Sequence, residues 1–190
     1  EQISQWLSQF RTKWKNTIEK DKGNYKGDYT LKYVRRVDRF NWIRIYLLIR
    51  TIRCSGLRPY YLKRMMFKNI ELFTDREGQQ YTLIQVLRHQ SKVSKRREVV
   101  TSDLDRLYWI YQDYRYEYEK FFGVEPSPEN LVFSKATDRN AESVLSLWVK
   151  KYLRKLDDML DVPVSYTRAE NGEKLHISLY SMRKTYISKQ

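Results

Sequence analysis

The sequence predicts a mainly helical α+β fold with a small three-stranded antiparallel sheet and a later β-hairpin. Apolar residues recur at helical spacing over most of the chain, whereas a central stretch changes to short segments bounded by turn residues. Of the 190 residues 41% are hydrophobic, and only six are glycine and four proline, so material for a buried core is ample. We therefore predict a single domain over residues 1–190, with an N-terminal helix and linker at 1–30 and a core at 31–190.

Three helices are expected before the sheet. The first is amphipathic and spans residues 3–18. The second spans residues 31–54, and its part from 42 to 52 is apolar on nearly every side, which places it deep in the core. Gly56 ends this helix, because glycine tolerates the left-handed backbone of a helix stop. A third, short helix over about 59–66 begins with a proline, which favours the first helical turn.

The predicted sheet consists of three short strands at residues 71–73, 81–87 and 98–100. A glycine-containing turn at 75–78 separates the first strand from the second, and a basic turn at 90–97 separates the second from the third. We expect neighbouring strands to pair antiparallel.

A stripe of large side chains marks one face of the helix that follows the sheet. Its members recur at spacings of three and four and are Leu104, Leu107, Tyr111, Tyr114, Tyr118 and Phe121. Such regular spacing is typical of burial, so we interpret the stripe as core. A stacking platform for nucleic-acid bases is the alternative interpretation.

The last third of the chain is expected to be mixed. Pro126 and Pro128 interrupt the preceding helix, and Asn171-Gly172 predicts a hairpin turn. The expected elements are an extended segment at 131–133, a helix at 140–160, paired strands at 165–168 and 174–177, and a helix at 179–189.

The net charge of +14, from 37 Lys and Arg against 23 Asp and Glu, indicates a polyanionic partner such as nucleic acid. No apolar run is long and uncharged enough to span a bilayer, so we expect a soluble protein without a membrane partner. The lone Cys54 permits no internal disulfide, which fits a reducing compartment. Because the chain opens on Glu1 rather than Met, we expect it to be a piece of a longer protein.

Few residues of the sequence suit metal or cofactor chemistry. A zinc site is not expected from the two histidines, His89 and His176. Asp157 and Asp158 are neighbours on a predicted helix and point in different directions, so a metal-dependent nuclease has little support. We expect no metal and no cofactor, and phosphoryl chemistry would have to depend on positive charge.

Four short segments are informative about function because of the order in which they occur along the chain. They are Ser55-Gly56-Leu57-Arg58, Gln90-Ser91-Lys92, Asn130-Leu131-Val132-Phe133 and, near the end, Leu179-Tyr180-Ser181-Met182-Arg183-Lys184. They resemble the first arginine box, the lysine turn of the small sheet, the following extended segment and the second arginine box of the tyrosine recombinases, the phage integrase family. The resemblance covers about residues 35–190 and implies a recombinase-like catalytic domain.

The resemblance implies metal-free transesterification of DNA through a 3'-phosphotyrosine intermediate. Arg58 and Arg183 would offer paired donors to the non-bridging oxygens of the scissile phosphate. Lys92, with Lys95 as second choice, would act as general acid on the leaving 5'-oxygen. Tyr180 stands in the place of the family's usual histidine and would donate a hydrogen bond to the same phosphate. The parent protein would be a site-specific recombinase that integrates or excises mobile DNA.

The implied partners are double-stranded DNA and, in the full-length protein, further copies of the same chain in a tetrameric recombination complex. The basic residues expected to contact DNA are Lys95, Arg96, Arg97 and Lys184. The implied location is the cytoplasm of a prokaryotic or phage-infected cell, in association with the nucleoid.

Several positions depart from the family's pattern. Tyr61 stands where many members have glutamate, and Val100-Thr101 stands where the third strand ordinarily ends in Pro-Leu. After Arg183 there is no His or Trp box, and we reject Tyr186 as nucleophile because it shares a predicted helix with Arg183. We therefore expect a domain truncated before its C-terminal helices and its nucleophile, which binds DNA without cleaving it.

Each basic segment also has a non-catalytic interpretation. Arg58 alone is compatible with a capping or surface residue, and Lys92 lies in a basic run that is typical of a solvated turn. The alternative function is therefore a non-catalytic basic helical module that binds DNA or RNA. Under this alternative Arg58, Lys92 and Arg183 need not converge.

Overall fold

The computed structural model describes residues 8, 9, 12, 29–90, 93–101, 107–145, 147, 150, 151, 165–167 and 174–176. Its main helices are α2 (Tyr29–Ser55), α3 (Pro59–Leu62) and α4 (Leu107–Phe122), with a 3-10 turn η1 (Phe67–Asn69). Its strands are β1 (Ile70–Thr74), β2 (Gln80–Gln90), β3 (Val93–Thr101), β4 (Ser134–Lys135), β5 (Asp138–Glu142), β6 (Ser165–Thr167) and β7 (Lys174–His176). The predicted α+β class with a small antiparallel sheet and a later hairpin is confirmed. Of the predicted first helix only residues 8, 9 and 12 are described, and they are helical.

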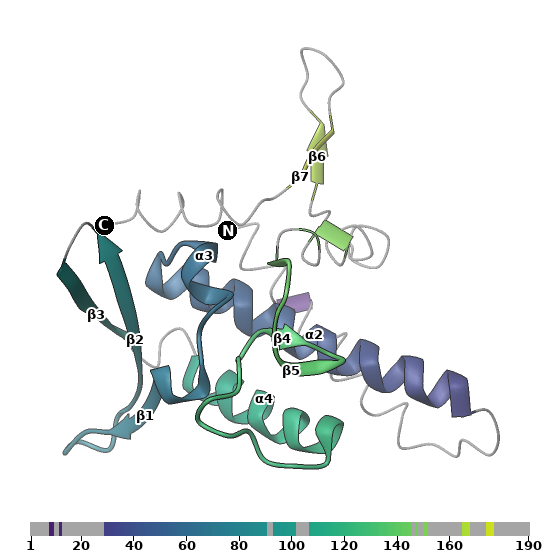
Figure 1. Cartoon of the computed structure of the whole chain (residues 1–190), viewed down its shortest axis with the longest axis horizontal. Helices are drawn as coiled ribbons and strands as arrows, with labels where there is room; N and C mark the ends of the chain where they lie inside the picture. The colour runs from purple at the N-terminus through teal and green to yellow at the C-terminus, as the bar shows by residue number, and fades with distance from the viewer. Residues whose placement is uncertain are drawn as a thin grey trace.

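Helices α2 and α4 lie side by side and form the core (Figure 1). Residues 40–49 of α2 are all buried, which confirms most of the deep segment predicted there. Phe40 stacks on Tyr114 with ring centroids 5.8 Å apart and on Phe121 at 4.4 Å. The buried tyrosines of the stripe are Tyr111, Tyr114 and Tyr118. The core interpretation is therefore confirmed and the base-stacking alternative is wrong for these three residues, whereas Leu104 of the stripe lies outside the described residues.

The helix predicted at 59–66 is shorter than expected, because the chain after Leu62 pairs with a distant segment. The N–H of Phe67 donates to the carbonyl of Asn130 at 3.1 Å, and the N–H of Val132 donates to the carbonyl of Met65 at 2.8 Å. These backbone groups are satisfied across the core rather than within a continuing helix.

The three-stranded sheet has the order β1-β2-β3, and both of its pairs are antiparallel, as predicted. The turn after β1 is also as predicted: Gly78 has φ +81°, and the Asp75 carboxylate accepts hydrogen bonds from the N–H groups of Glu77 (2.9 Å) and Gln79 (2.8 Å). The basic turn predicted at 90–97 is wrong, because most of it is strand. A ladder of backbone hydrogen bonds does not require apolar side chains, and Gln90 pairs with Val93 across a two-residue connection.

A second hairpin, β4–β5, was not predicted, and its strand β5 occupies the start of the helix expected at 140–160. Within it the Asp138 carboxylate accepts a hydrogen bond from the N–H of Asn140 at 2.9 Å, a local bond that competes with helix. Residues 145, 147, 150 and 151 are helical as predicted, and residues 152–160 of the predicted helix lie outside the described residues. The predicted pairing of β6 with β7 is confirmed, with Tyr166 opposite Leu175.

Replacing Gly56 by alanine is expected to lower the free energy of unfolding by about 1 kcal/mol or more, because Gly56 has φ +60°. Chemical denaturation would measure the loss. The matched control is Gly78→Ala, which adds the same kind of backbone strain at φ +81° in the turn between β1 and β2. Both variants should be destabilised, because each places a Cβ at a positive φ. A Gly56→Ala variant as stable as the original chain would contradict the role of Gly56 as the stop of α2.

Candidate functional site

Arg58 stands at the turn between α2 and α3, where hydrogen bonds fix the local backbone. The N–H of Gly56 donates to the carbonyl of Ile52 at 2.9 Å, and the N–H of Leu57 donates to the Ser55 hydroxyl at 3.3 Å. The Leu57 side chain is only 2% exposed and anchors the turn in the core. Arg58 follows with an extended backbone, φ −73° and ψ 143°, and an exposed side chain. This arrangement presents a guanidinium to solvent, where it can bind an anion.

Further basic side chains surround an exposed tyrosine immediately after Arg58. Tyr60 is 51% exposed, and the Lys63 ammonium and the Arg64 guanidinium lie 5.2 and 5.1 Å from its ring centroid. We call Arg58, Tyr60, Lys63 and Arg64 the α3 patch. Glu142 of β5 forms ion pairs with two residues of this patch: its carboxylate is 3.0 Å from the Lys63 ammonium and 2.9 Å from Nε of Arg64.

The Glu142 carboxylate is ionised at neutral pH. The hydrogen bond from Lys63 holds the pKa of Glu142 below its ordinary value, and the charges of Lys63 and Arg64 act in the same direction. In contrast, no carboxylate among the described residues lies within ion-pair distance of Arg58. Arg58 is therefore the basic residue of the α3 patch whose charge Glu142 does not neutralise.

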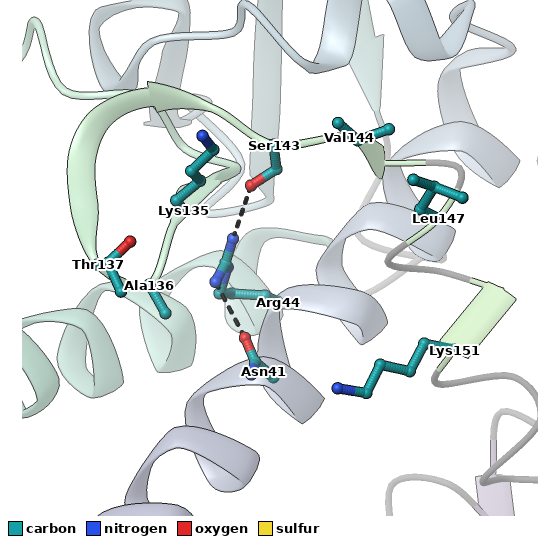
Figure 2. Close-up of a pocket in the computed structure, with 9 residues that line it drawn as sticks. All are labelled: Asn41, Arg44, Lys135, Ala136, Thr137, Ser143, Val144, Leu147 and Lys151. Atoms are coloured by element: carbon teal, nitrogen blue, oxygen red, sulfur yellow. Dashed lines mark hydrogen bonds between the residues drawn. The ribbon is translucent and has the colours of Figure 1, made fainter.

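A cavity of about 400 Å³ lies between α2 and the β4–β5 hairpin (Figure 2). It is lined by Asn41, Arg44, Lys135, Ala136, Thr137, Ser143, Val144, Leu147 and Lys151. Arg44 is 2% exposed and donates to the Asn41 side chain at 3.0 Å, to the Ser143 hydroxyl at 3.5 Å and to the Ser134 carbonyl. These bonds tie both ends of the hairpin to α2. Arg44 therefore positions β5, the strand that carries Glu142.

The structure places only part of the site predicted from the sequence. Arg58 is described and exposed. Lys95, Arg96 and Arg97 lie on β3, where the backbone pairs them with Arg88, Leu87 and Val86. Lys92, Tyr180, Arg183 and Lys184 lie outside the described residues, as does Tyr186. The convergence of Arg58, Lys92 and Arg183 therefore stays a prediction.

Sequence reasoning missed Arg44, Lys63, Arg64 and Glu142. A signal existed for Arg44, since it is a charged residue within an otherwise apolar helical segment. A weaker one existed for Lys63 and Arg64, which follow the arginine box by about one helical turn. No local signal marked Glu142, because its partner Arg64 is 78 residues away in the sequence.

The buried tyrosines of α4 are unsuited to nucleophilic attack. Tyr114 donates its hydroxyl proton to the Val132 carbonyl, and burial raises its pKa well above the ordinary value of a tyrosine. Burial likewise raises the pKa of Tyr118 to about 12. Both side chains are 0% exposed, so neither can reach a DNA phosphate.

The described residues contain neither a metal-binding cluster nor a membrane-spanning helix. No group of three or more His, Cys, Asp or Glu there is arranged to hold a metal ion. No helix in that part of the chain is long and apolar enough to cross a membrane.

The fold is similar to that of the XerH site-specific recombinase in two solved complexes with DNA. The pre-cleavage complex with difH substrate matches with a TM-score of 0.54 and 16% identity, over 98% of this chain and 40% of the recombinase chain. The post-cleavage complex with palindromic difH substrate matches with a TM-score of 0.54 and 15% identity, over 98% and 39%. No protein-family model and no curated protein match the sequence. The chain thus has a fold similar to that of this site-specific recombinase and spans about 40% of its length.

Proposed function

We propose that this chain is the catalytic domain of a tyrosine-type site-specific recombinase that integrates or excises DNA. The observation that carries the proposal is the recombinase-like fold, in which Arg58 is exposed at the turn that resembles the first arginine box. The domain comprises residues 1–190, with 1–30 as N-terminal helix and linker and 31–190 as recombinase-like core. No residue of this chain is assigned as the nucleophile, so the chain alone binds DNA without cleaving it.

In the proposed reaction the oxygen of a tyrosine attacks the scissile phosphorus, its hydroxyl proton passes to water, and the bond to the 5'-oxygen breaks. Arg58 and Arg183 bind the non-bridging oxygens, whose negative charge increases in the transition state. Tyr180 donates a hydrogen bond to the same phosphate, and Lys92 gives its proton to the leaving oxygen. The new phosphotyrosine link retains the energy needed for rejoining, so no nucleotide and no metal is required.

The proposed partners are duplex DNA and, in the full-length protein, further copies in a tetrameric complex. Lys95, Arg96, Arg97 and Lys184 contact the DNA backbone in this proposal. The XerH complexes, which contain DNA substrates, support the choice of DNA as partner. A cytoplasmic, nucleoid-associated location in a prokaryotic or phage-infected cell follows from the same proposal.

The isolated chain is expected to bind a fluorescent duplex of about 30 base pairs of random sequence, mostly through phosphates. If six or more phosphates are contacted, affinity should fall by about 10³-fold or more between about 50 and 200 mM salt. Fluorescence anisotropy over this salt range would measure the slope. No binding at the lowest salt would contradict the proposal. A non-catalytic basic module would bind the duplex in the same way, so formation of a covalent protein–DNA adduct is the measurement that separates it from a recombinase.

A further inference from the structure

We propose that the Glu142 carboxylate competes with DNA for two cations. In the free protein it pairs with Lys63 and Arg64, and a phosphate of the bound duplex displaces it from them. The inference rests on the proposed function, because it requires that duplex DNA lies against Arg58. It adds to that function a second phosphate-binding position and a residue that limits access to it.

Arg58 and the two cations, Lys63 and Arg64, lie close together along the chain. The N–H of Tyr61 donates to the Arg58 carbonyl at 2.9 Å, and the N–H of Lys63 donates to the Pro59 carbonyl at 3.1 Å. These bonds keep the segment compact, so Lys63 lies about 8 Å of helical rise beyond Arg58. Each phosphate of one strand lies about 3.4 Å further along the duplex axis than the one before it. A strand that runs along α3 from Arg58 would therefore place a later phosphate near Lys63 and Arg64.

The Glu142 carboxylate and a DNA phosphate are similar groups, so the same cations can bind either. A carboxylate and a phosphate both offer paired anionic oxygens, and the Glu142 oxygens each take one cation, Oε2 with Lys63 and Oε1 with Arg64. The Tyr60 ring lies 5.2 Å from the Lys63 ammonium and 5.1 Å from the Arg64 guanidinium and contributes cation–π contacts that do not depend on Glu142. The two cations are thus already placed to receive an anion.

The exposure of the three side chains to solvent decides whether a phosphate can displace Glu142. The side chains of Lys63, Arg64 and Glu142 are 32%, 54% and 40% exposed. Exposed ion pairs contribute little to stability, whereas a phosphate that replaces the carboxylate also releases counterions condensed on the duplex. The exchange therefore favours DNA at low salt. Its consequence is that Glu142 lowers the affinity of the free protein for polyanions without preventing binding.

The experiment compares Glu142→Gln with Glu129→Gln. Each change raises the net charge by one, and Glu129 also pairs with an exposed lysine, Lys68 at 2.8 Å, but not with the α3 patch. Anisotropy with the random-sequence duplex at about 100 mM salt should show about 3- to 10-fold tighter binding for Glu142→Gln. Glu129→Gln should change the affinity by less than about 2-fold. Thermal unfolding of each variant verifies that both are folded.

A second background makes the test independent of overall charge. When Lys63 and Arg64 are both replaced by glutamine, affinity should fall, and adding Glu142→Gln should then have no more effect than adding Glu129→Gln. Two results would overturn this inference alone. In the original background, Glu142→Gln could raise the affinity no more than Glu129→Gln does. In the background that lacks Lys63 and Arg64, Glu142→Gln could still raise the affinity more than Glu129→Gln does. A folded original chain that binds no duplex would overturn the proposed function and this inference with it.

Discussion

The Arg58→Ala variant of the full-length protein is expected to lose about 10²- to 10³-fold of its rate of covalent adduct formation with DNA. Under the proposed function the Arg58 guanidinium binds the scissile phosphate, and its paired donors gain most when charge develops in the transition state. The measurement is the rate at which a protease-sensitive protein–DNA adduct accumulates on a nicked suicide duplex that carries the target site. Duplex affinity should change far less, because one phosphate contact among several is lost.

Two further variants make this experiment decisive. Arg58→Lys retains the charge but not the planar pair of donors, so it should also lose most of the adduct rate. Arg76→Ala removes an arginine from the exposed turn between β1 and β2 and should leave the rate unchanged. If Arg58→Ala forms adduct at the original rate, the recombinase assignment of the site is wrong. If the original full-length protein never forms an adduct, the non-catalytic module becomes the better explanation.

The elements that could be predicted from the sequence are those whose cause is local. The deep part of α2 follows from an apolar run, its end follows from Gly56 with φ +60°, and the core face of α4 follows from tyrosines at spacings of three and four. The elements that were missed depend on partners far away in the chain. The short α3 is set by backbone bonds between residues near Met65 and residues near Val132.

The same division holds for the candidate site. Arg58 could be found because it follows a recognisable helix stop, and its exposure is confirmed. The role of Glu142 could not be found, because it depends on the unpredicted β4–β5 hairpin and on Arg44, which ties that hairpin to α2. A charged residue in an apolar helix signals a buried partner but does not say which one. Long-range pairing, rather than composition, therefore decides which charges of this basic chain are open to a ligand.

Tyr114→Ala is expected to lower the free energy of unfolding by about 3 to 5 kcal/mol, because it opens a cavity between α2 and α4. Tyr114 is 0% exposed and stacks on Phe40 and on Phe67, with ring centroids 5.8 and 6.0 Å apart. Chemical denaturation would measure the loss. Tyr116→Ala is the matched control on the same helix, since Tyr116 is 57% exposed, and it should change stability by less than about 0.5 kcal/mol.

The Tyr114→Phe variant tests whether the hydrogen bond of Tyr114 supports the segment next to the α3 patch. It keeps the ring but removes the hydroxyl that donates to the Val132 carbonyl, so a loss of about 1 kcal/mol is expected. The N–H of Val132 in turn donates to the Met65 carbonyl, just after the α3 patch. Tyr114→Phe should therefore increase hydrogen exchange at the N–H of Val132, whereas the N–H groups of α4 stay protected. Stability of Tyr114→Ala within about 1 kcal/mol of the original chain would mean that the α2–α4 contact is not the core of the fold.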